Sequence, residues 1–470
     1  MKHVEVDVAI IGAGTAGLSA RRAAMREGAT TVLIEDGPYG TTCARVGCMP
    51  SKLLIAAAEV THTARHAAPF GIDIEHVRVD GPAVMARVRG ERDRFVSFVV
   101  RDVEHMPSHE KLLGRARFLS DTELDVGGHT RVKARSIIIA TGTRPNIPSQ
   151  YQMLGDRAIV NDDVFEWQDL PESVLVIGAG VIGLELGQAL SRLGVRTRIL
   201  QRSMRLGGLR DPLVLQSAHA AFQEELDICL EAAILGIRRV GQEVEVRYQI
   251  PGSAEVTERF EYVLLAAGRR PNLDDIGLEN TSAKLNAHGM PAYDPVSLQI
   301  EGTPLFIAGD VNGILPLLHE AADDGRIAGR NAARFPQVEP GERRAPLSIV
   351  FSDPQLAAVG LRFTELPEDA AVGEVDFNNQ GRSRILLKNR GKLRVYADRG
   401  TGVFLGAEMA GPSMEHIAHL LAWAVQQRLT VQQMLAMPFY HPVVEEGVRT
   451  ALQHLARELQ PVPAPQESEA

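Results

Sequence analysis

A strand-like apolar run, a glycine loop and a helical pattern open the chain, and a second apolar run follows them. Their order is Val4–Ile11, Gly12, Gly14, Gly17, Leu18–Glu27, Thr31–Ile34 and Glu35. In such a unit the glycines let the backbone approach a pyrophosphate, the helix N-terminus supplies N–H groups, and the closing acid accepts ribose hydroxyls. The pattern therefore predicts a dinucleotide-binding unit at the start of the chain.

The same pattern returns further along the chain. Its order is Val174–Ile177, Gly178, Gly180, Gly183, Leu184–Leu193 and Thr197–Leu200. Gln201 takes the place that Glu35 has in the first unit, and Arg202 follows it. A carboxylate there would repel the 2′-phosphate of NADP, whereas an arginine would attract it. We therefore expect NADPH rather than NADH, with Arg202 as the first phosphate-binding candidate and Arg205 as the second. The alternative is that Gln201 accepts NAD and Arg202 only faces solvent.

The remaining patterns predict an α/β protein with two Rossmann-like dinucleotide-binding domains and a C-terminal α+β domain. Strand patterns precede three turns, Thr141-Gly142, Gly268-Arg269 and Gly309-Asp310, and the second of these strands covers Phe260–Ala267. Helical patterns cover Lys52–Ala67, Gly90–Met106, His319–Ala333, Ser413–Arg428 and Thr430–Met437. We place the domains at residues 1–150, 151–272, 273–343 (a return to the first domain) and 344–456. The Pro/Glu-rich residues 457–470 are expected to be disordered.

Composition narrows the classes of function. The 470 residues carry 50 Lys and Arg against 59 Asp and Glu, so the net charge of −9 offers no basic footprint for nucleic acid. No apolar run reaches the roughly 18 residues that a membrane span needs. Acids near the N-terminus stand where a signal peptide would be apolar, so we predict a cytoplasmic protein without a membrane partner.

Two of the three cysteines, Cys43 and Cys48, stand close together and are followed by Pro-Ser-Lys. A helix beginning just after them would favour a thiolate, and the pair could form and break a disulfide repeatedly. A structural disulfide or two unrelated buried thiols are the alternatives. Cys229, in an apolar run, is expected to be buried. We predict no metal site, because the histidine pairs His62/His66 and His105/His109 lack further ligands.

The ordered set of motifs resembles the flavin-dependent pyridine nucleotide-disulfide oxidoreductases, the family of dihydrolipoamide dehydrogenase, glutathione reductase and mercuric reductase. The set includes both glycine loops, the cysteine pair, Ala140-Thr141-Gly142, Gly268–Asn272, Ala308-Gly309-Asp310 and His441-Pro442 with Glu446. The resemblance implies FAD in the first unit, a nicotinamide nucleotide in the second, and a C-terminal domain that forms a homodimer. It also implies cofactor contacts at Thr42, Lys52, Thr141, Gly142, Gly268, Arg269 and Asp310.

The resemblance implies a role for each catalytic candidate. Cys48 would lie against the flavin and Cys43 would exchange with the substrate. Lys52 would lie near the flavin and pair with Glu185. His441, held by Glu446, would act as acid and base on the thiols of the other subunit. Val443 stands where the family usually has Thr, and Arg45 stands where it usually has Asn.

Within the family, the cysteine stretch resembles dihydrolipoamide dehydrogenase and mercuric reductase, whereas Gln201-Arg202 resembles the NADPH-type enzymes. Our first interpretation is a dihydrolipoyl dehydrogenase-like enzyme acting on a dithiol or on a partner's lipoyl group. The second is an NADPH-dependent reductase of a small disulfide or a metal– or metalloid–thiol compound. A non-catalytic flavoprotein redox sensor ranks third, since Cys43, Cys48, Lys52 and His441 are all present.

Overall fold

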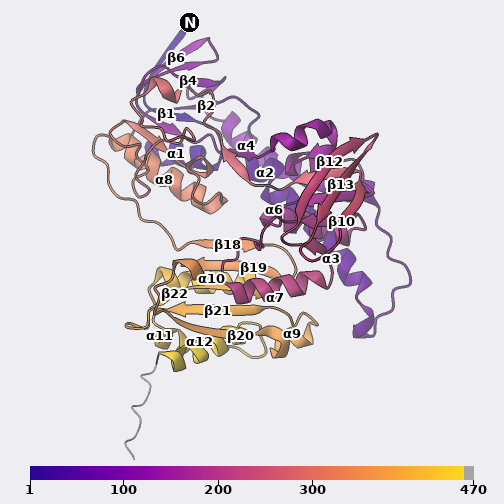
Figure 1. Cartoon of the computed structure of the whole chain (residues 1–470). Helices are drawn as coiled ribbons and strands as arrows, with labels where there is room; N and C mark the ends of the chain where they lie inside the picture. The colour runs from indigo at the N-terminus through magenta and orange to yellow at the C-terminus, as the bar shows by residue number, and fades with distance from the viewer. Residues whose placement is uncertain (460–470) are drawn as a thin grey trace, which may run out of the picture.

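The computed structural model of the chain describes residues 1–459 (Figure 1). The predicted disorder over residues 460–470 concerns residues outside this range. Helix α12 continues to Glu458, two residues past the end predicted for the last domain. The described chain forms three sheets of five or more strands, each with its own helices.

The first sheet contains the N-terminal nucleotide unit and has the strand order β3-β2-β1-β6-β5-β4, with β17 paired to β6. Its strands are β1 Lys2–Ile11, β2 Thr31–Glu35, β3 Lys111–Leu113, β4 Ala116–Phe118, β5 Glu123–Val126, β6 Thr130–Ile139 and β17 Leu305–Ile307. Helices α1 (Thr15–Arg26) and α8 (Leu318–Arg334) pack closely on each other. A Cβ added at Gly329 of α8 would fall 2.2 Å from the carbonyl oxygen of Ala20, so this contact depends on glycine.

The second sheet contains the other nucleotide unit and is parallel throughout, in the order β11-β10-β9-β15-β8. Its strands are β8 Ala158–Ile159, β9 Ser173–Ile177, β10 Arg196–Leu200, β11 Asp227–Cys229 and β15 Tyr262–Leu265. An antiparallel sheet of β12 (Ala233–Val240), β13 (Glu243–Gln249) and β14 (Val256–Phe260) lies beside it. The single strand predicted over Phe260–Ala267 is wrong, because Phe260 ends β14 in one sheet and Tyr262 begins β15 in another.

A two-stranded ribbon joins the two nucleotide units. Strand β7 (Thr143–Pro145) pairs antiparallel with β16 (Arg269–Pro271). Just before β7, the Thr141 hydroxyl donates to the carbonyl oxygen of Asn272 at 2.7 Å, and the Asn272 amide donates back to the Thr141 carbonyl at 2.9 Å. The Thr141-Gly142 motif and the Gly268–Asn272 motif are therefore hydrogen-bonded to each other and form one structural element.

The C-terminal sheet is antiparallel and has the order β18-β19-β22-β21-β20. Its elements are β18 Leu347–Val350, β19 Gln355–Gly360, β20 Ala371–Asp376, β21 Lys392–Ala397, β22 Phe404–Gly411, α9 Gly381–Ile385, α10 Met414–Gln426, α11 Val431–Leu435 and α12 Glu446–Glu458. Helix α7 (Pro212–Gln223) of the second unit packs on β21 and β22. Its fully buried N-cap, Asp211, accepts hydrogen bonds from Tyr396 at 2.8 Å and Arg394 at 2.6 Å, which ties the two parts together.

The helices after the first nucleotide loop begin earlier than predicted. Cys43 lies in α2 (Thr42–Val46), and α3 runs from Cys48 to Arg65 rather than from Lys52. Helix α4 runs from Gly81 to Glu104, because the side chain of Asp80 accepts from the backbone of Ala83 and caps it. Phe98 on α4 is 48% exposed. Cys229 is half-buried rather than buried.

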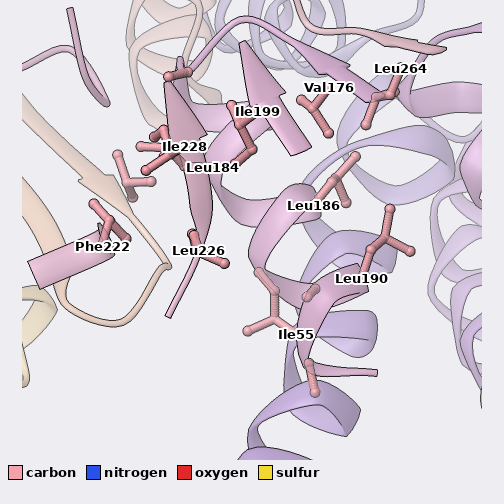
Figure 2. Close-up of a cluster of buried hydrophobic side chains, with 14 of the residues drawn as sticks. Ile55, Val176, Leu184, Leu186, Leu190, Ile199, Phe222, Leu226, Ile228 and Leu264 are labelled. Carbon is pink, nitrogen blue, oxygen red and sulfur yellow. The ribbon is translucent and has the colours of Figure 1, made fainter. Parts of the chain in front are cut away.

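One hydrophobic core joins the cysteine-bearing helix to the second nucleotide unit. Figure 2 shows Ile55 of α3 beside side chains of α6 (Val181–Arg192), and Val176 of β9 and Ile199 of β10 belong to the same core. The core also includes Leu184, Leu186 and Leu190 of α6 and Phe222 of α7. The redox helix and the predicted nicotinamide-binding unit therefore share one packed interior.

Candidate active site

The two cysteines lie on either side of the break between α2 and α3. Both are free thiols, and a hydrogen bond from Cys43 stabilises the Cys48 thiolate. That hydrogen bond and the nearby Lys52 cation outweigh burial and lower the pKa of Cys48 to about 7. The same hydrogen bond and burial raise the pKa of Cys43. Above about pH 7 the pair therefore holds one proton, which stays on Cys43.

Lys52 and Glu185 are in contact. Lys52 Nζ lies 2.7 Å from Glu185 Oε2, and the Glu185 side chain is only 5% exposed. The other oxygen, Glu185 Oε1, accepts the backbone N–H of Phe351 at 3.0 Å, and the Lys52 ammonium lies 4.5 Å from the centre of the Phe351 ring. A buried carboxylate held by two donors fixes the lysine one helical turn from Cys48.

A cleft of about 590 Å³ follows the first glycine loop. Its lining includes Gly12, Gly14, Glu35, Thr42 and the Thr141-Gly142 turn, together with Thr41, Arg45, Arg115, Arg144, Arg270, Asn272, Asp274 and Asp275. Glu35 is held inside it, because its Oε2 accepts the backbone N–H of Ala13 at 2.7 Å. Six of the predicted contacts of the first unit thus line one cleft, whereas Gly17, Lys52 and Asp310 are not part of its lining.

The three glycines of the first loop meet different surroundings. A Cβ on Gly12 would lie 2.3 Å from the Ala140 carbonyl oxygen, and one on Gly17 would lie 1.9 Å from that of Gly12. A Cβ on Gly14 would meet no protein atom within 4 Å. The loop therefore packs tightly on the strand ends and leaves open space at the start of α1. This arrangement fits the pyrophosphate of FAD.

The second glycine loop repeats this geometry. A Cβ on Gly183 would lie 1.8 Å from the Gly178 carbonyl oxygen, whereas one on Gly180 would meet nothing within 4 Å. Gln201 Oε1 accepts the backbone N–H of Ala179 at 3.2 Å, as Glu35 does for Ala13 in the first unit. A cavity of about 140 Å³ lies beside Gly180, lined in part by Gly268, Arg269 and Asn161.

Arg202 and Arg205, beyond β10, are exposed. Within residues 1–459, neither side chain forms an ion pair with a carboxylate. They offer positive charge at the outer edge of the second unit, beside a glutamine in the place of the acid. A 2′-phosphate bound there would meet no repelling carboxylate at that position.

Asp310 lies where the joining ribbon meets the first unit. The Thr143 hydroxyl donates to Asp310 Oδ2 at 3.3 Å, and Arg269 donates to that same hydroxyl at 2.9 Å. Burial raises the pKa of Asp310, and the Arg269 charge opposes this effect. Behind it, Asp324 Oδ2 accepts the backbone N–H of Gly309 at 3.0 Å and holds the turn in place.

His441 and Glu446 form a pair on the C-terminal part of the chain. His441 Nδ1 lies 3.0 Å from Glu446 Oε1, and the backbone N–H of Val443 donates to Glu446 Oε2 at 3.2 Å. The hydrogen bond from His441 lowers the pKa of Glu446. The imidazole is 81% exposed, and no hydrogen bond joins it to either cysteine within the described chain. The fold therefore holds the tautomer of His441 but leaves its Nε2 facing outward.

Comparison with known proteins agrees with this geometry. Residues 6–325 match the Pyridine nucleotide-disulphide oxidoreductase family, and residues 347–452 match the dimerisation domain of the same family. The chain belongs to the pyridine nucleotide-disulphide oxidoreductases. It is an FAD-dependent enzyme that also uses a pyridine nucleotide, and its dimerisation domain supports a homodimer.

The similar proteins include dihydrolipoyl dehydrogenases and a mercuric reductase. The chain is 30% identical over 453 residues to a dihydrolipoyl dehydrogenase of Chlamydia trachomatis, covering 94% of each chain. It is 29% identical over 467 residues to a mercuric reductase of Streptomyces lividans, covering 96% of each. LpdA from Mycobacterium tuberculosis shares the fold with a TM-score of 0.80 at 24% identity, covering 97% of this chain and all of that one. The enzyme is most like dihydrolipoyl dehydrogenase, and the glutathione- or mercuric-reductase alternative is not favoured.

Two contacts of the site were not predicted from the sequence, although Asn272 belongs to one of the motifs found there. Asn272 bridges to Thr141, and Asn161 of α5 (Asn161–Val164) donates to the Val46 carbonyl oxygen at 2.7 Å, between the two cysteines. Neither residue has a periodic signal, since each acts through a contact with a distant segment.

No helix among residues 1–459 is long and apolar enough to cross a membrane.

The predicted histidine pairs do not form a metal site in the described chain. His62 Nδ1 lies 3.3 Å from Glu225 and its ring stacks on His66, with ring centroids 4.1 Å apart. Residues 1–459 contain no group of three His, Cys, Asp or Glu side chains that could hold a metal ion. His62 thus contacts Glu225 of the second nucleotide unit.

The glycine geometry predicts two different defects. Gly14→Ala should fold normally and lose FAD affinity, because its new methyl group would enter the space left for the pyrophosphate. Gly17→Ala should lower the melting temperature even without cofactor, because its methyl group would collide with the Gly12 carbonyl. FAD content and thermal unfolding of the two purified variants would check this. Normal FAD content in Gly14→Ala would contradict the assignment.

Proposed function

We propose that the enzyme transfers electrons between a nicotinamide nucleotide and a small dithiol or disulfide, such as a lipoyl group, through Cys48 and Cys43. The observation that carries this proposal is the lowered pKa of Cys48 beside Lys52 and buried Glu185. Bound FAD would supply two-electron transfer between the nucleotide and the thiols. The residues of this chain position the charged groups next to the thiols and transfer the protons of the reaction.

Cys48 is the thiol assigned to the flavin side, although in the described chain Cys48 is exposed and Cys43 is half-buried. The Cys48 thiolate is stabilised near neutral pH, whereas Cys43 keeps its proton. Lys52 supplies a positive charge one turn along α3. The hydrogen bond to Glu185 restrains the Lys52 ammonium and keeps it from extending into solvent. Cys43 is then the thiol that exchanges with the substrate sulfur, and it needs a base to take its proton.

His441 is that base, and it acts on the cysteine pair of the other subunit. Its exposed imidazole and the dimerisation domain around it support a site completed by a second copy. Glu446 keeps the proton on Nδ1, so Nε2 is free to accept a thiol proton. A single subunit would then have no complete site.

The second unit prefers NADPH to NADH. Gln201 keeps the backbone contact that an acid would make, through the Ala179 N–H, without a negative charge. Its amide nitrogen donates to the Ser203 hydroxyl at 3.0 Å, which sets the orientation of the side chain. Exposed Arg202, with Arg205 nearby, then attracts the 2′-phosphate.

The roles of the two cysteines can be tested by absorption spectroscopy. The FAD-loaded Cys43→Ser protein should show a long-wavelength thiolate–flavin band that grows as pH rises through about 7, the pKa of Cys48. The serine hydroxyl can still donate to the Cys48 thiolate, so the midpoint should move little. Cys48→Ser should lack the band. A band in Cys48→Ser alone would reverse the assignment.

Subunit hybrids test the position of His441. The His441→Gln homodimer should lose activity by about 10²- to 10⁴-fold while keeping flavin reduction by NAD(P)H. A hybrid of a His441→Gln subunit with a Cys43→Ser subunit should recover one intact site, because each site combines the two chains. Differently tagged subunits would allow the hybrid to be purified. An inactive hybrid would place histidine and cysteines of one site in the same chain.

Initial rates test the nucleotide and the substrate together. NADH and NADPH, or their oxidised forms, would be crossed with lipoamide, dihydrolipoamide, glutathione disulfide and mercuric ion. We expect the lipoyl compounds to give the highest kcat/KM, with NADP(H) preferred. Arg202→Glu should shift this preference toward NAD(H), and Arg210→Glu, outside the loop, serves as the matched charge control. An unchanged ratio in Arg202→Glu would exclude Arg202 as the phosphate contact.

A further inference from the structure

Four arginines line the cleft of the first nucleotide unit, and they differ in how their charge is balanced. Arg144 forms an ion pair with Asp274, and Arg270 Nη2 lies 3.8 Å from the same carboxylate. Arg115 Nη2 lies 3.5 Å from Asp275. The fourth, Arg45, forms no side-chain hydrogen bond or ion pair within residues 1–459. Its charge acts on the carboxyl of Asp162, which lies outside the cleft lining, but without a direct contact. Among the four cleft arginines, Arg45 is therefore the one without a carboxylate in contact.

The stem of Arg45 is held in place by packing. A Cβ added to Gly40 would lie 3.0 Å from Arg45 Cδ and 2.8 Å from Val96 Cγ1 of α4. Gly40 has φ +124°, a backbone conformation that glycine adopts easily and other residues rarely do. The missing side chain at Gly40 thus leaves a narrow space in which the methylenes of Arg45 lie, and the guanidinium reaches the cleft.

The ligand chemistry of the cleft is that of a phosphate. The same cleft contains the open space at Gly14 and the start of α1, where N–H groups and the helix dipole favour an anion. Glu35 forms no ion pair with Arg45 in the described chain, and its carboxylate instead accepts the backbone N–H groups of Ala13 and Gly37. A planar guanidinium binds phosphate oxygens with two parallel hydrogen bonds.

We propose that Arg45 binds the pyrophosphate of FAD. This contact would hold the segment from Cys43 to Cys48 in a fixed position relative to the cofactor. Arg45 lies on α2 between Cys43 and Cys48, so its contact restrains the segment that carries both thiols. Asn161 also restrains this segment, by donating to the Val46 carbonyl oxygen at 2.7 Å. The proposal rests on FAD binding in the first unit and not on the identity of the thiol substrate.

The test separates charge from packing at one position. Arg45→Met keeps a long apolar stem against Gly40 and Val96 but removes the cation, whereas Arg45→Lys keeps the cation. Arg94→Met, an exposed position on neighbouring α4, is the matched control. The holoenzyme variants would be diluted into buffer containing mild chaotrope, and FAD release would be followed by the rise in flavin fluorescence.

We expect FAD affinity to fall by about tenfold to a hundredfold in Arg45→Met, the range of one charge-assisted hydrogen bond. Arg45→Lys should lose much less, and Arg94→Met should behave as the wild type. Should Arg45→Met lose its circular dichroism, Arg45→Gln would replace it in the comparison with Arg45→Lys.

Three outcomes would overturn the proposal. Unchanged FAD release in the uncharged variant would mean that Arg45 only fills space. Equal losses in the methionine and lysine variants would make shape rather than charge the cause. Unchanged FAD release with a raised KM for an anionic thiol substrate would assign Arg45 to the substrate. Because release is measured without turnover, the result does not depend on whether the proposed substrate is correct.

Discussion

The buried carboxylate of Glu185 is the contact on which the arrangement of the site depends. An ionised group in the interior is tolerated only when it is paired and hydrogen-bonded. Here its partners come from two other parts of the chain, Lys52 on the redox helix and the Phe351 N–H before β19. Helix α6 therefore cannot move away from α3 or from the C-terminal sheet without leaving a buried charge unpaired.

The requirement that buried polar groups be paired also joins the three sheets to one another. Asp211 at the start of α7 is fully buried and receives hydrogen bonds from Tyr396 and Arg394 of the C-terminal sheet. On the other side, the β7–β16 ribbon joins the nucleotide units through Thr141 and Asn272. Polar contacts at these junctions fix direction as well as distance, which apolar packing alone does not do.

The two nucleotide units show how one geometry serves two ligands. In each, the third glycine packs on the first and the second faces open space. In each, a side chain at the end of the second strand accepts the same backbone N–H, from Glu35 in one unit and Gln201 in the other. The exchange of carboxylate for amide keeps the loop in place and removes a charge. Ligand preference can therefore change without a change of fold.

The sequence by itself determined both nucleotide units, the cysteine pair and the family, because glycine spacing and strand periodicity are local properties that a short segment expresses wherever it lies. It also indicated Lys52 with Glu185 and His441 with Glu446. It missed the start of α3 at Cys48, the break at Glu261, and the contacts of Asn161 and Asn272. Only the tertiary structure decided which cleft arginines are neutralised, since Asp274 and Asp275 reach Arg144 and Arg115 across more than a hundred residues of chain. Charge balance belongs to neighbours in space, and for Arg45 no local pattern reports it.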